Sequence, residues 1–388
     1  MGPHGRALPG LPPEGAQGLL GRPCEALGPH IANSWIDIAI VYFRRRGGVA
    51  TMRPMDTSNL LFRARRAVAA FIALAAWALS QGASAAPRCA PLPGALVDAA
   101  QLRALLPCVR VVDIRQGDDI ADAPWAAGHI PGALAAPYAL WRGPANDPGR
   151  LLDRTDFQAL VRSLGLTRDT PVVLVADGGS PSDFGAPARV YWTLKWLGLR
   201  QLAILNGGMQ AWSAAHGALT RDAAAPAHSD FVAAPQPALD ASREQIAQWL
   251  AHEPGAAQLL DARPRAFYLG QVKAPAAWQP GTLPGAADFA FSHWFPDGSG
   301  TLPPLAELQR IARGLPPRAS GQRLVSFCNT GHWAAINWFV LSEVLHQPEV
   351  ELYPESMVGW SRAHEPMEHV PSRSAQLWGQ LQQTWKSL

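Results

Sequence analysis

Residues 323–341 read RLVSFCNTGHWAAINWFVL, and this stretch decides the fold. Residues 324–327 predict a short buried strand, and residues 334–345 predict a largely apolar helix. Cys328 therefore stands where a strand ends and a helix begins. The tight polar loop between them, residues 328–333, is expected to point its backbone N–H groups toward the thiol.

A cysteine in this position is suited to nucleophilic attack on an anion. The thiolate is the reactive form, and backbone amides at a helix N-terminus stabilise negative charge on the sulfur and on an anionic substrate. Buried cysteines also occur as inert, small apolar side chains. The polar, glycine-containing loop directly after Cys328 favours the nucleophile, because an inert core cysteine would have apolar neighbours on both sides.

The composition is that of a folded protein with room for two domains. The chain has 388 residues, of which 48% are hydrophobic, and its formal net charge is +3. This hydrophobic fraction excludes wholesale disorder, and so small a charge gives no indication of nucleic-acid binding.

The start of the sequence predicts a leader. Residues 1–51 are rich in Gly and Pro without sustained periodicity, so an unstructured or mis-assigned N-terminal extension is expected there. Residues 52–86 contain an Arg-rich segment, an uninterrupted apolar run over 67–79 and an A-x-A site, which is the pattern of a secretory signal peptide. We expect cleavage after Ala85 or Ala86 and export to a bacterial periplasm.

The position of this signal peptide inside the chain favours a translation start at Met52 or Met55. An uncleaved membrane anchor and an organelle leader stay open as alternatives, and Arg88 directly before Cys89 argues against lipid attachment. After cleavage no stable membrane insertion is expected.

Removal of the leader leaves Cys89, Cys108 and Cys328. In an oxidising compartment Cys89 and Cys108 are predicted to pair, which would close a loop near the new N-terminus. A thiol count of the unreduced mature protein should then find one free thiol, that of Cys328.

The mature chain contains an internal repeat. Three motifs recur in the same order: Asp-x-Arg at 113–115 and 261–263, a Gly-x-x-Pro-Gly-Ala turn at 128–133 and 281–286, and a segment with Met and Trp at 208–212 and 356–360. Matches in the same order indicate a duplicated domain.

Each copy alternates short β-branched runs with helical patterns. The predicted strands are 109–114, 172–176 and 202–205 in the first copy and 258–261, 324–327 and 350–353 in the second. This alternation predicts an α/β fold in which each copy forms a parallel sheet flanked by helices on both faces. The predicted parts of the mature chain are a first domain over 87–215, a surface linker over 216–239, a second domain over 240–365 and a C-terminal helix over 366–388.

The repeated motifs and the cysteine loop resemble those of the tandem rhodanese family of thiosulfate and 3-mercaptopyruvate sulfurtransferases. The likeness covers about residues 95–365. It implies two tandem rhodanese-like domains, of which the C-terminal one holds the catalytic cysteine, Cys328. The corresponding loop of the first copy, residues 176–181, has no cysteine. The first copy is therefore expected to be an inactive half that closes one wall of the site.

The resemblance also implies a two-step exchange. The Cys328 thiolate attacks the outer sulfur of a donor such as thiosulfate, sulfite leaves, and the persulfide passes its sulfur to a thiophilic acceptor. Cyanide, a small thiol or a protein thiol are the expected acceptors, and 3-mercaptopyruvate or a protein persulfide are alternative donors. Neither a metal nor an organic cofactor is needed, and the enzyme should show ping-pong kinetics.

The anionic part of the donor is expected to meet the loop after the cysteine. The backbone amides of Asn329, Thr330, Gly331, His332 and Trp333 would hold this anion and stabilise charge on the persulfide. His332 is the one side chain of the loop that can become a cation. It is expected either to act as an anion partner or proton donor, or only to brace the loop by hydrogen bonds.

Thiosulfate-using members of the family typically carry cationic residues just after the cysteine, and this loop has none besides His332. The family's substrate-binding arginine falls on or near Phe267, so Arg265 or Lys273 is expected to serve instead. Arg263 is expected to pair with a carboxylate and hold its loop, as a structural residue together with Asp261.

Other functions remain as alternatives. The phosphatase branch of the same fold binds phosphate with an arginine six positions after the cysteine, and here that position is Ala334. A non-catalytic sulfur carrier or binding module would use tryptophans such as Trp278 and Trp333 as a docking surface, although most large aromatics belong to cores. Steady turnover with a small thiol acceptor would separate an enzyme from a carrier. A metal site is not expected, because Cys328 and His332 alone do not make a zinc site.

Overall fold

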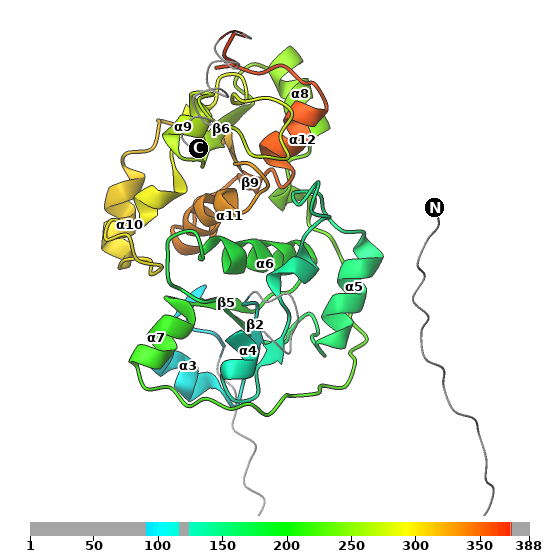
Figure 1. The fold of residues 1–388 in the computed structure, drawn as a ribbon, viewed down its shortest axis with the longest axis vertical. Helices are drawn as coiled ribbons and strands as arrows, with labels where there is room; N and C mark the ends of the chain where they lie inside the picture. Colours follow the sequence, from blue (N-terminus) through cyan, green and yellow to red (C-terminus); the bar gives the residue numbers. More distant parts are fainter. Residues whose placement is uncertain (1–90, 116–123, 373, 375–388) are drawn as a thin grey trace, which may run out of the picture. The chain divides into compact units, whose positions relative to one another are not determined.

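The computed structural model describes residues 91–115, 124–372 and 374 (Figure 1). These residues belong to one compact unit of the chain. The predicted N-terminal extension, the whole signal peptide region and most of the predicted C-terminal helix lie outside the described residues. Within the described part, no helix is long and apolar enough to cross a membrane.

The first copy alternates strands and helices along the chain, as predicted (Figure 1). Its elements are β1 (Leu96–Val97), α3 (Ala99–Leu105), β2 (Arg110–Asp113), α4 (Pro124–Ala127), β3 (Leu134–Ala135), the 3-10 helix η1 (Tyr138–Trp141), α5 (Arg154–Ser163), β4 (Val172–Val175), α6 (Gly185–Trp196), β5 (Leu202–Leu205) and α7 (Gly208–Ala214).

The second copy repeats this alternation after a short 3-10 helix, η2 (Pro237–Leu239). Its elements are α8 (Arg243–His252), β6 (Ala257–Asp261), α9 (Arg265–Tyr268), β7 (Ala287–Asp288), the 3-10 helix η3 (Phe291–Trp294), α10 (Leu305–Ala312), β8 (Arg323–Phe327), α11 (Trp333–Trp338), the π-helix η4 (Phe339–Val344), β9 (Val350–Leu352) and α12 (Ser356–Arg362).

Both sheets are parallel, which confirms the predicted α/β class. The first sheet has five strands in the order β1-β5-β4-β2-β3, and the second has four in the order β7-β6-β8-β9. An isolated parallel bridge between Asp240 and Leu352 takes the place in the second copy that β1 has beside β5 in the first. Each predicted strand matches an observed strand to within one residue at either end.

The first helix of each copy begins with the same capping device. The Asp98 side chain accepts a hydrogen bond from the Gln101 N–H, and the Gln101 side chain accepts one from the Asp98 N–H. Ser242 and Gln245 form the same capping box before α8. Such a reciprocal pair satisfies two backbone donors that a helix start would otherwise leave unpaired.

The helix predicted over 334–345 begins at Trp333 and changes its winding part-way. It is α-helical through Trp338 and continues as the π-helix Phe339–Val344. An apolar run without regular polar positions cannot distinguish these two windings in the sequence. In the π-helix, the buried Glu343 carboxylate accepts hydrogen bonds from Tyr191 and Lys195 of α6, at 2.8 and 2.6 Å.

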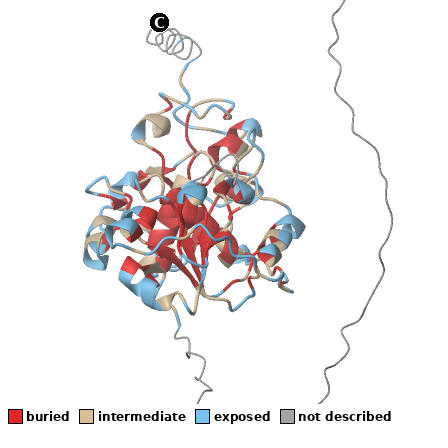
Figure 2. Cartoon of the chain, turned by 60° about the horizontal axis from the view of Figure 1, so that its bottom comes forward, coloured by how far each residue is buried: buried red, intermediate tan, exposed pale blue. Residues whose placement is uncertain are grey.

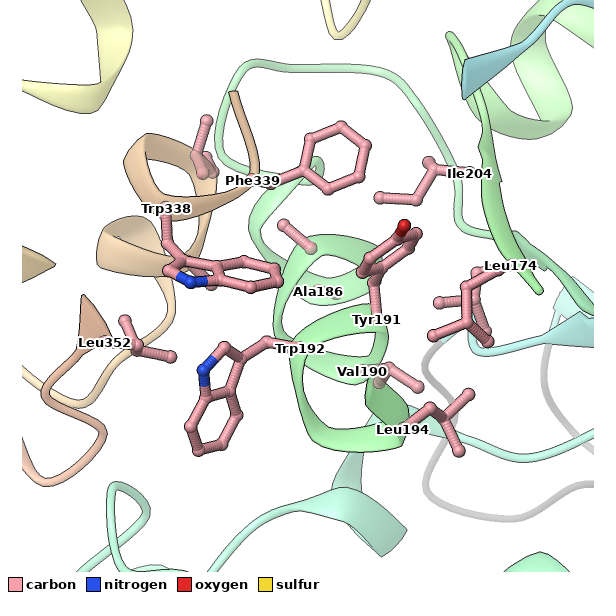
Figure 3. Packing of buried hydrophobic residues seen from close by; sticks show 14 of the residues in the cluster. Leu174, Ala186, Val190, Tyr191, Trp192, Leu194, Ile204, Trp338, Phe339 and Leu352 are labelled. Atoms are coloured by element: carbon pink, nitrogen blue, oxygen red, sulfur yellow. The ribbon is translucent and has the colours of Figure 1, made fainter. Parts of the chain in front are cut away.

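One hydrophobic core crosses the boundary between the two copies (Figures 2 and 3). Helices α6 and α11 contact each other at its centre (Figure 1). Figure 3 shows Leu174 and Ile204 of the first sheet on one side of α6, and Leu352 of the second sheet on the other. Between them, Tyr191 meets Phe339 edge-on with ring centroids 5.0 Å apart. The burial of large aromatic rings at this boundary holds the two copies together.

The predicted linker lies over the first copy and is mostly exposed. Thr220 forms an isolated antiparallel bridge with His129, and Phe231 and Ala233 are buried in the common core. Near the start of the first copy, Cys108 is disulfide-bonded. Its predicted partner Cys89 lies outside the described residues, so the pairing stays a prediction.

Candidate active site

Cys328 lies at the carboxyl end of β8, directly before the loop that leads into α11. Only 1% of its surface is exposed, and it is a free cysteine. Its N–H donates a hydrogen bond to the Ser356 hydroxyl at 3.0 Å, and its carbonyl accepts one from the Met357 N–H at 3.0 Å. The start of α12 therefore fixes the backbone of this cysteine and leaves its thiol for chemistry.

The loop after Cys328 presents a run of backbone donors. From Asn329 to Trp333, no backbone N–H donates a hydrogen bond to any group in the described part of the chain. Gly331 has a φ of +70°, a left-handed conformation that turns the loop at its middle. Successive free N–H groups in such a turn form a concave site for an anion.

The equivalent loop of the first copy starts at Ala176. The Met209 N–H donates to the Ala176 carbonyl at 2.8 Å, just as the Met357 N–H donates to the carbonyl of Cys328. Ala176 is therefore the structural counterpart of the cysteine.

The backbone donors of the first loop are satisfied by a side chain of that loop. The Asp183 carboxylate accepts hydrogen bonds from the N–H groups of Gly179 and Ser180, at 2.9 and 3.0 Å. It also accepts one from the Ser180 hydroxyl at 2.9 Å. An internal anion thus occupies donors whose counterparts in the second copy are free.

His332 joins the second loop to the first copy. The Tyr138 hydroxyl lies 3.0 Å from its Nδ1, and the Ser182 carbonyl lies 2.9 Å from its Nε2. A carbonyl oxygen only accepts, so Nε2 carries the proton and Nδ1 accepts from Tyr138. Burial, followed by repulsion from Arg142, lowers the pKa of His332 to about 4. The ring is therefore neutral near pH 7, and of the two expected roles the structure favours the brace over the cationic anion partner.

Two arginines of the first copy bind the same loop. Arg142 Nη2 donates to the Thr330 carbonyl at 2.7 Å, and Arg189 Nη1 donates to it at 3.3 Å. Burial, followed by repulsion from Arg142, lowers the pKa of Arg189 to about 9, so the guanidinium stays charged at neutral pH. The first copy thus supplies the positive charge that the sequence of the loop lacks.

Gly331 is required by this contact with the first copy. A Cβ at this position would collide with the Arg189 guanidinium and would lie 2.6 Å from the Pro354 carbonyl oxygen. The left-handed backbone and the closely packed arginine therefore both favour glycine.

The predicted pairing of Arg263 with a carboxylate is confirmed. Arg263 Nη2 lies 2.6 Å from Asp261 Oδ2, and both side chains are buried. Arg263 Nη1 also donates to the Asn329 side-chain oxygen at 3.4 Å, which tethers the first residue after the cysteine. Arg115 and Asp113 form the same buried pair at 2.7 Å in the first copy.

Arg265 and Lys273 have partners away from the loop, and the expected donor role of either residue stays a prediction. Arg265 is ion-paired with Asp288 at 2.8 Å and its side chain is 71% exposed. Lys273 donates to a nearby backbone carbonyl at 2.8 Å. Helix α9 is a single short turn that starts at Arg265. Its Phe267 ring, and not this arginine, faces Trp333, and the centroids of the two rings are 6.0 Å apart.

Aromatic rings rather than cations line this side of the loop. Trp333 stacks on Phe291 with centroids 5.0 Å apart, and its indole N–H donates to the Ser182 hydroxyl at 2.8 Å. Trp278, which was considered for a docking surface, is 65% exposed and lies beside His364. In the described residues there is no cluster of three or more side chains suited to bind a metal ion.

Tyr138, Arg142, Ser182 and Arg189 were not predicted as site residues. Their contacts join positions far apart in the chain, such as the 194 residues between Tyr138 and His332, and no local pattern shows such contacts. One signal was present in the sequence. Arg189 is the lone charge in the otherwise apolar segment 184–194 of α6, and a charge on such a helix indicates a specific buried contact.

Comparison with known proteins identifies the family. The rhodanese-like domain family matches residues 98–215, which form the first copy. The "Probable 3-mercaptopyruvate sulfurtransferase" of Pseudomonas aeruginosa is 33% identical over 282 residues, which cover 68% of this chain and 94% of that protein. The chain belongs to the rhodanese sulfurtransferase family. It is accordingly a sulfurtransferase enzyme of two tandem rhodanese domains.

Other rhodanese relatives agree in fold and differ in their named donor. The "Putative thiosulfate sulfurtransferase" of Synechococcus elongatus is 24% identical over 276 residues, covering 68% of this chain and 81% of that protein. The crystal structure of the 3-mercaptopyruvate sulfurtransferase SseA from Escherichia coli matches with a TM-score of 0.57 and 25% identity, over 68% of this chain and 98% of that one.

Proposed function

We propose that this rhodanese moves sulfane sulfur from a small anionic donor to a thiophilic acceptor through a persulfide on Cys328. One observation carries the proposal. A free cysteine is followed directly by free backbone N–H groups, at the point where the first copy has Ala176 and amides filled by a carboxylate. Free donors beside a nucleophile are suited to an anionic substrate and to the negative charge that develops during transfer.

The first half-reaction loads the cysteine. With thiosulfate, the Cys328 thiolate attacks the outer sulfur, the sulfur–sulfur bond of the donor breaks, and sulfite leaves with the bonding electron pair. The N–H groups after the cysteine hold the oxyanion during attack and stabilise the persulfide anion that results. Because both thiosulfate and the departing sulfite are anions, these backbone N–H groups can bind the substrate and also the leaving group.

The second half-reaction unloads the cysteine. A thiolate or cyanide attacks the outer sulfur of the persulfide, a new bond to the acceptor forms, and the Cys328 thiolate is regenerated. The two substrates react in turn with one residue, so ping-pong kinetics are expected. Neither step requires a change in the charge of His332, which only positions the loop.

A second donor, 3-mercaptopyruvate, is favoured by a specific observation. The described part of the catalytic loop has no Lys or Arg side chain, and an aromatic ring, Phe267, lies where the family's donor-binding arginine is expected. With this donor the carbon–sulfur bond breaks, and the leaving group takes up a proton to give pyruvate. The name of the Pseudomonas relative supports this candidate.

We propose further that the protein works after export, in the periplasm. The signal-peptide pattern before residue 87 supports this location, and so does the disulfide bond of Cys108, because such bonds persist in oxidising compartments. N-terminal sequencing of the secreted protein tests the cleavage site. A start well before residue 85 in the exported protein would contradict it.

Steady-state transfer with each donor, to cyanide and to a small thiol, tests the proposed reaction. Thiosulfate or 3-mercaptopyruvate should give parallel reciprocal plots, and Cys328→Ser should lower turnover by at least about a thousandfold. Ala176→Ser changes the counterpart position of the first copy and should keep wild-type turnover. Turnover by Cys328→Ser would contradict the proposal, and silence with every donor would favour a sulfur carrier.

A further inference from the structure

Arg142 and Arg189 bring two positive charges to the Cys328 loop without a carboxylate partner. Both donate to the Thr330 carbonyl, and within the described part of the chain neither forms an ion pair with Asp or Glu. Arg189 is only 1% exposed. Burial of a charge without a counter-charge is costly, and two like charges at one carbonyl increase that cost.

Each guanidinium also has a buried N–H group without an acceptor. These groups are Nη1 of Arg142 and Nε of Arg189. A guanidinium carries five donors in a planar fork that fits the oxygens of a carboxylate or sulfonate. An oxyanion within reach of these groups would supply an acceptor and a negative charge.

Among the described residues, the other groups around the two arginines form no ion pair with either guanidinium. Asp240 interacts with Arg189 without forming an ion pair, and burial raises the pKa of this carboxyl to about 6. Tyr138 is neutral because burial raises its pKa, and the His332 imidazole is neutral as well. Cys328 also interacts electrostatically with Arg189. The two guanidinium groups therefore place positive charge beside the loop that follows Cys328.

We propose that Arg142 and Arg189 form an anion subsite for the carboxylate or sulfonate end of the sulfur donor. The inference rests on the proposed function, because the anion it assigns is that of the donor. A donor bound in this way has its oxygens toward the first copy and its transferable sulfur toward Cys328. The first copy, whose own loop has no cysteine, then supplies the charge recognition that the catalytic loop lacks.

Alkylation of Cys328 with two reagents of different charge separates anion recognition from sulfur transfer. Iodoacetate is an anion and iodoacetamide is neutral, and both react with the same thiolate. The ratio of their rate constants therefore reports attraction for the anion and cancels the reactivity of the sulfur. This ratio should exceed that of a free cysteine derivative in the wild-type protein.

Replacement of the arginines should lower that ratio. Arg142→Gln and Arg189→Gln should each reduce it about tenfold, and Arg142→Lys should keep most of it, because the charge remains. Arg200→Gln is the matched control, since Arg200 is an exposed arginine of the first copy that pairs with Asp169. Arg142 is half-buried, so its variants decide the test if the Arg189 variant does not fold.

Donor kinetics give a second readout on the same variants. Arg142→Gln should raise KM for thiosulfate or 3-mercaptopyruvate about tenfold, and should leave KM for an uncharged organic persulfide within about twofold. An unchanged alkylation ratio or an equal rise for the uncharged donor in folded Arg142→Gln would overturn the subsite and leave the proposed function intact. Absence of transfer in a wild-type protein that still prefers iodoacetate would instead overturn the proposed function.

Discussion

In the first copy, the loop after β4 is closed by its own carboxylate, whereas the loop after β8 in the second copy keeps its backbone donors free. Asp183 accepts from the N–H groups of Gly179 and Ser180, while the backbone N–H groups of residues 329–333 donate to no described group. Both loops follow a central strand of a parallel sheet. One duplicated scaffold therefore holds a self-satisfied loop in one copy and a loop prepared for an anion in the other.

The first copy, which has no cysteine in its loop, nevertheless contributes to the candidate active site. Its degenerate loop offers Ser182, which accepts from both His332 and Trp333, and Tyr138 donates to the other nitrogen of His332. The first copy thus binds the second loop by side chains and by the Ser182 carbonyl. The two copies therefore contribute different parts of the candidate site. Cys328 lies in the second copy, and groups of the first copy hold the loop that follows it.

The largest effect on sulfur transfer is expected when the cysteine is moved from the second loop to the first. The double variant Cys328→Ser with Ala176→Cys should transfer sulfur at least about a thousandfold more slowly than wild type, because Asp183 already fills the amides of the first loop and repels an anionic donor. Ala176→Cys alone should keep wild-type turnover. Transfer by the double variant within about tenfold of wild type would show that the first loop is competent.

Gly331→Ala should disturb the second loop at its closest contact with the first copy. The left-handed backbone and the collision with Arg189 should cost about 3 kcal/mol in free energy of unfolding, and displacement of the loop should lower turnover about a hundredfold. Gly285→Ala is the control, since it has a φ of +66° and open space around its Cβ position. Its expected cost is about 1 kcal/mol. Equal losses in chemical denaturation would refute the role of the contact.

His332→Gln replaces the imidazole that joins the second loop to Tyr138 and Ser182 of the first copy. Because the pKa of His332 is lowered to about 4, the unfolded chain binds this proton more tightly, and the stability that the neutral ring contributes is present above its unfolded pKa and lost as pH falls. From about pH 7 to about pH 5, the stability of wild type relative to His332→Gln should fall by about 1 to 2 kcal/mol.

Denaturation of both proteins across this pH range measures the effect, and groups common to the two proteins cancel in the difference. If wild type instead becomes more stable relative to His332→Gln as the pH falls, His332 is held as a cation.

Arg265→Gln should have the smallest effect. Its ion pair with Asp288 is exposed, so the loss in free energy of unfolding should stay below about 0.5 kcal/mol. KM for either donor should change by less than about twofold, since this arginine lies on the surface of α9. A large rise in KM would show that Arg265, a residue of the second copy, binds the anionic donor.

Structural features that depend on a single stretch of the chain could be predicted from the sequence. The strands follow from their β-branched runs, the duplication follows from the ordered motifs, and the position of Cys328 follows from the change from strand to helix. The pairing of Arg263 with a carboxylate was predicted from the repeated Asp-x-Arg motif, and the structure shows that Asp261 is the partner.

The contacts between the copies could not be predicted in this way. Arg189 and Thr330 are 141 residues apart, and their contact depends on how α6 packs against α11. The ion pair of Arg265 with Asp288 could not be predicted either, because the orientation of a four-residue helix is set by its surroundings and not by its composition. The filling of the first loop by Asp183 likewise depends on backbone geometry that the sequence does not display.

The intact mass of the protein after incubation with a sulfur donor tests the division between the two copies most directly. Wild type and Ala176→Ser should each gain the mass of one sulfur atom, which cyanide removes, and Cys328→Ser should gain none. Sulfur bound to Cys328→Ser, or a wild-type protein that gains no sulfur from any donor, would contradict the assignment of Cys328 as the persulfide carrier.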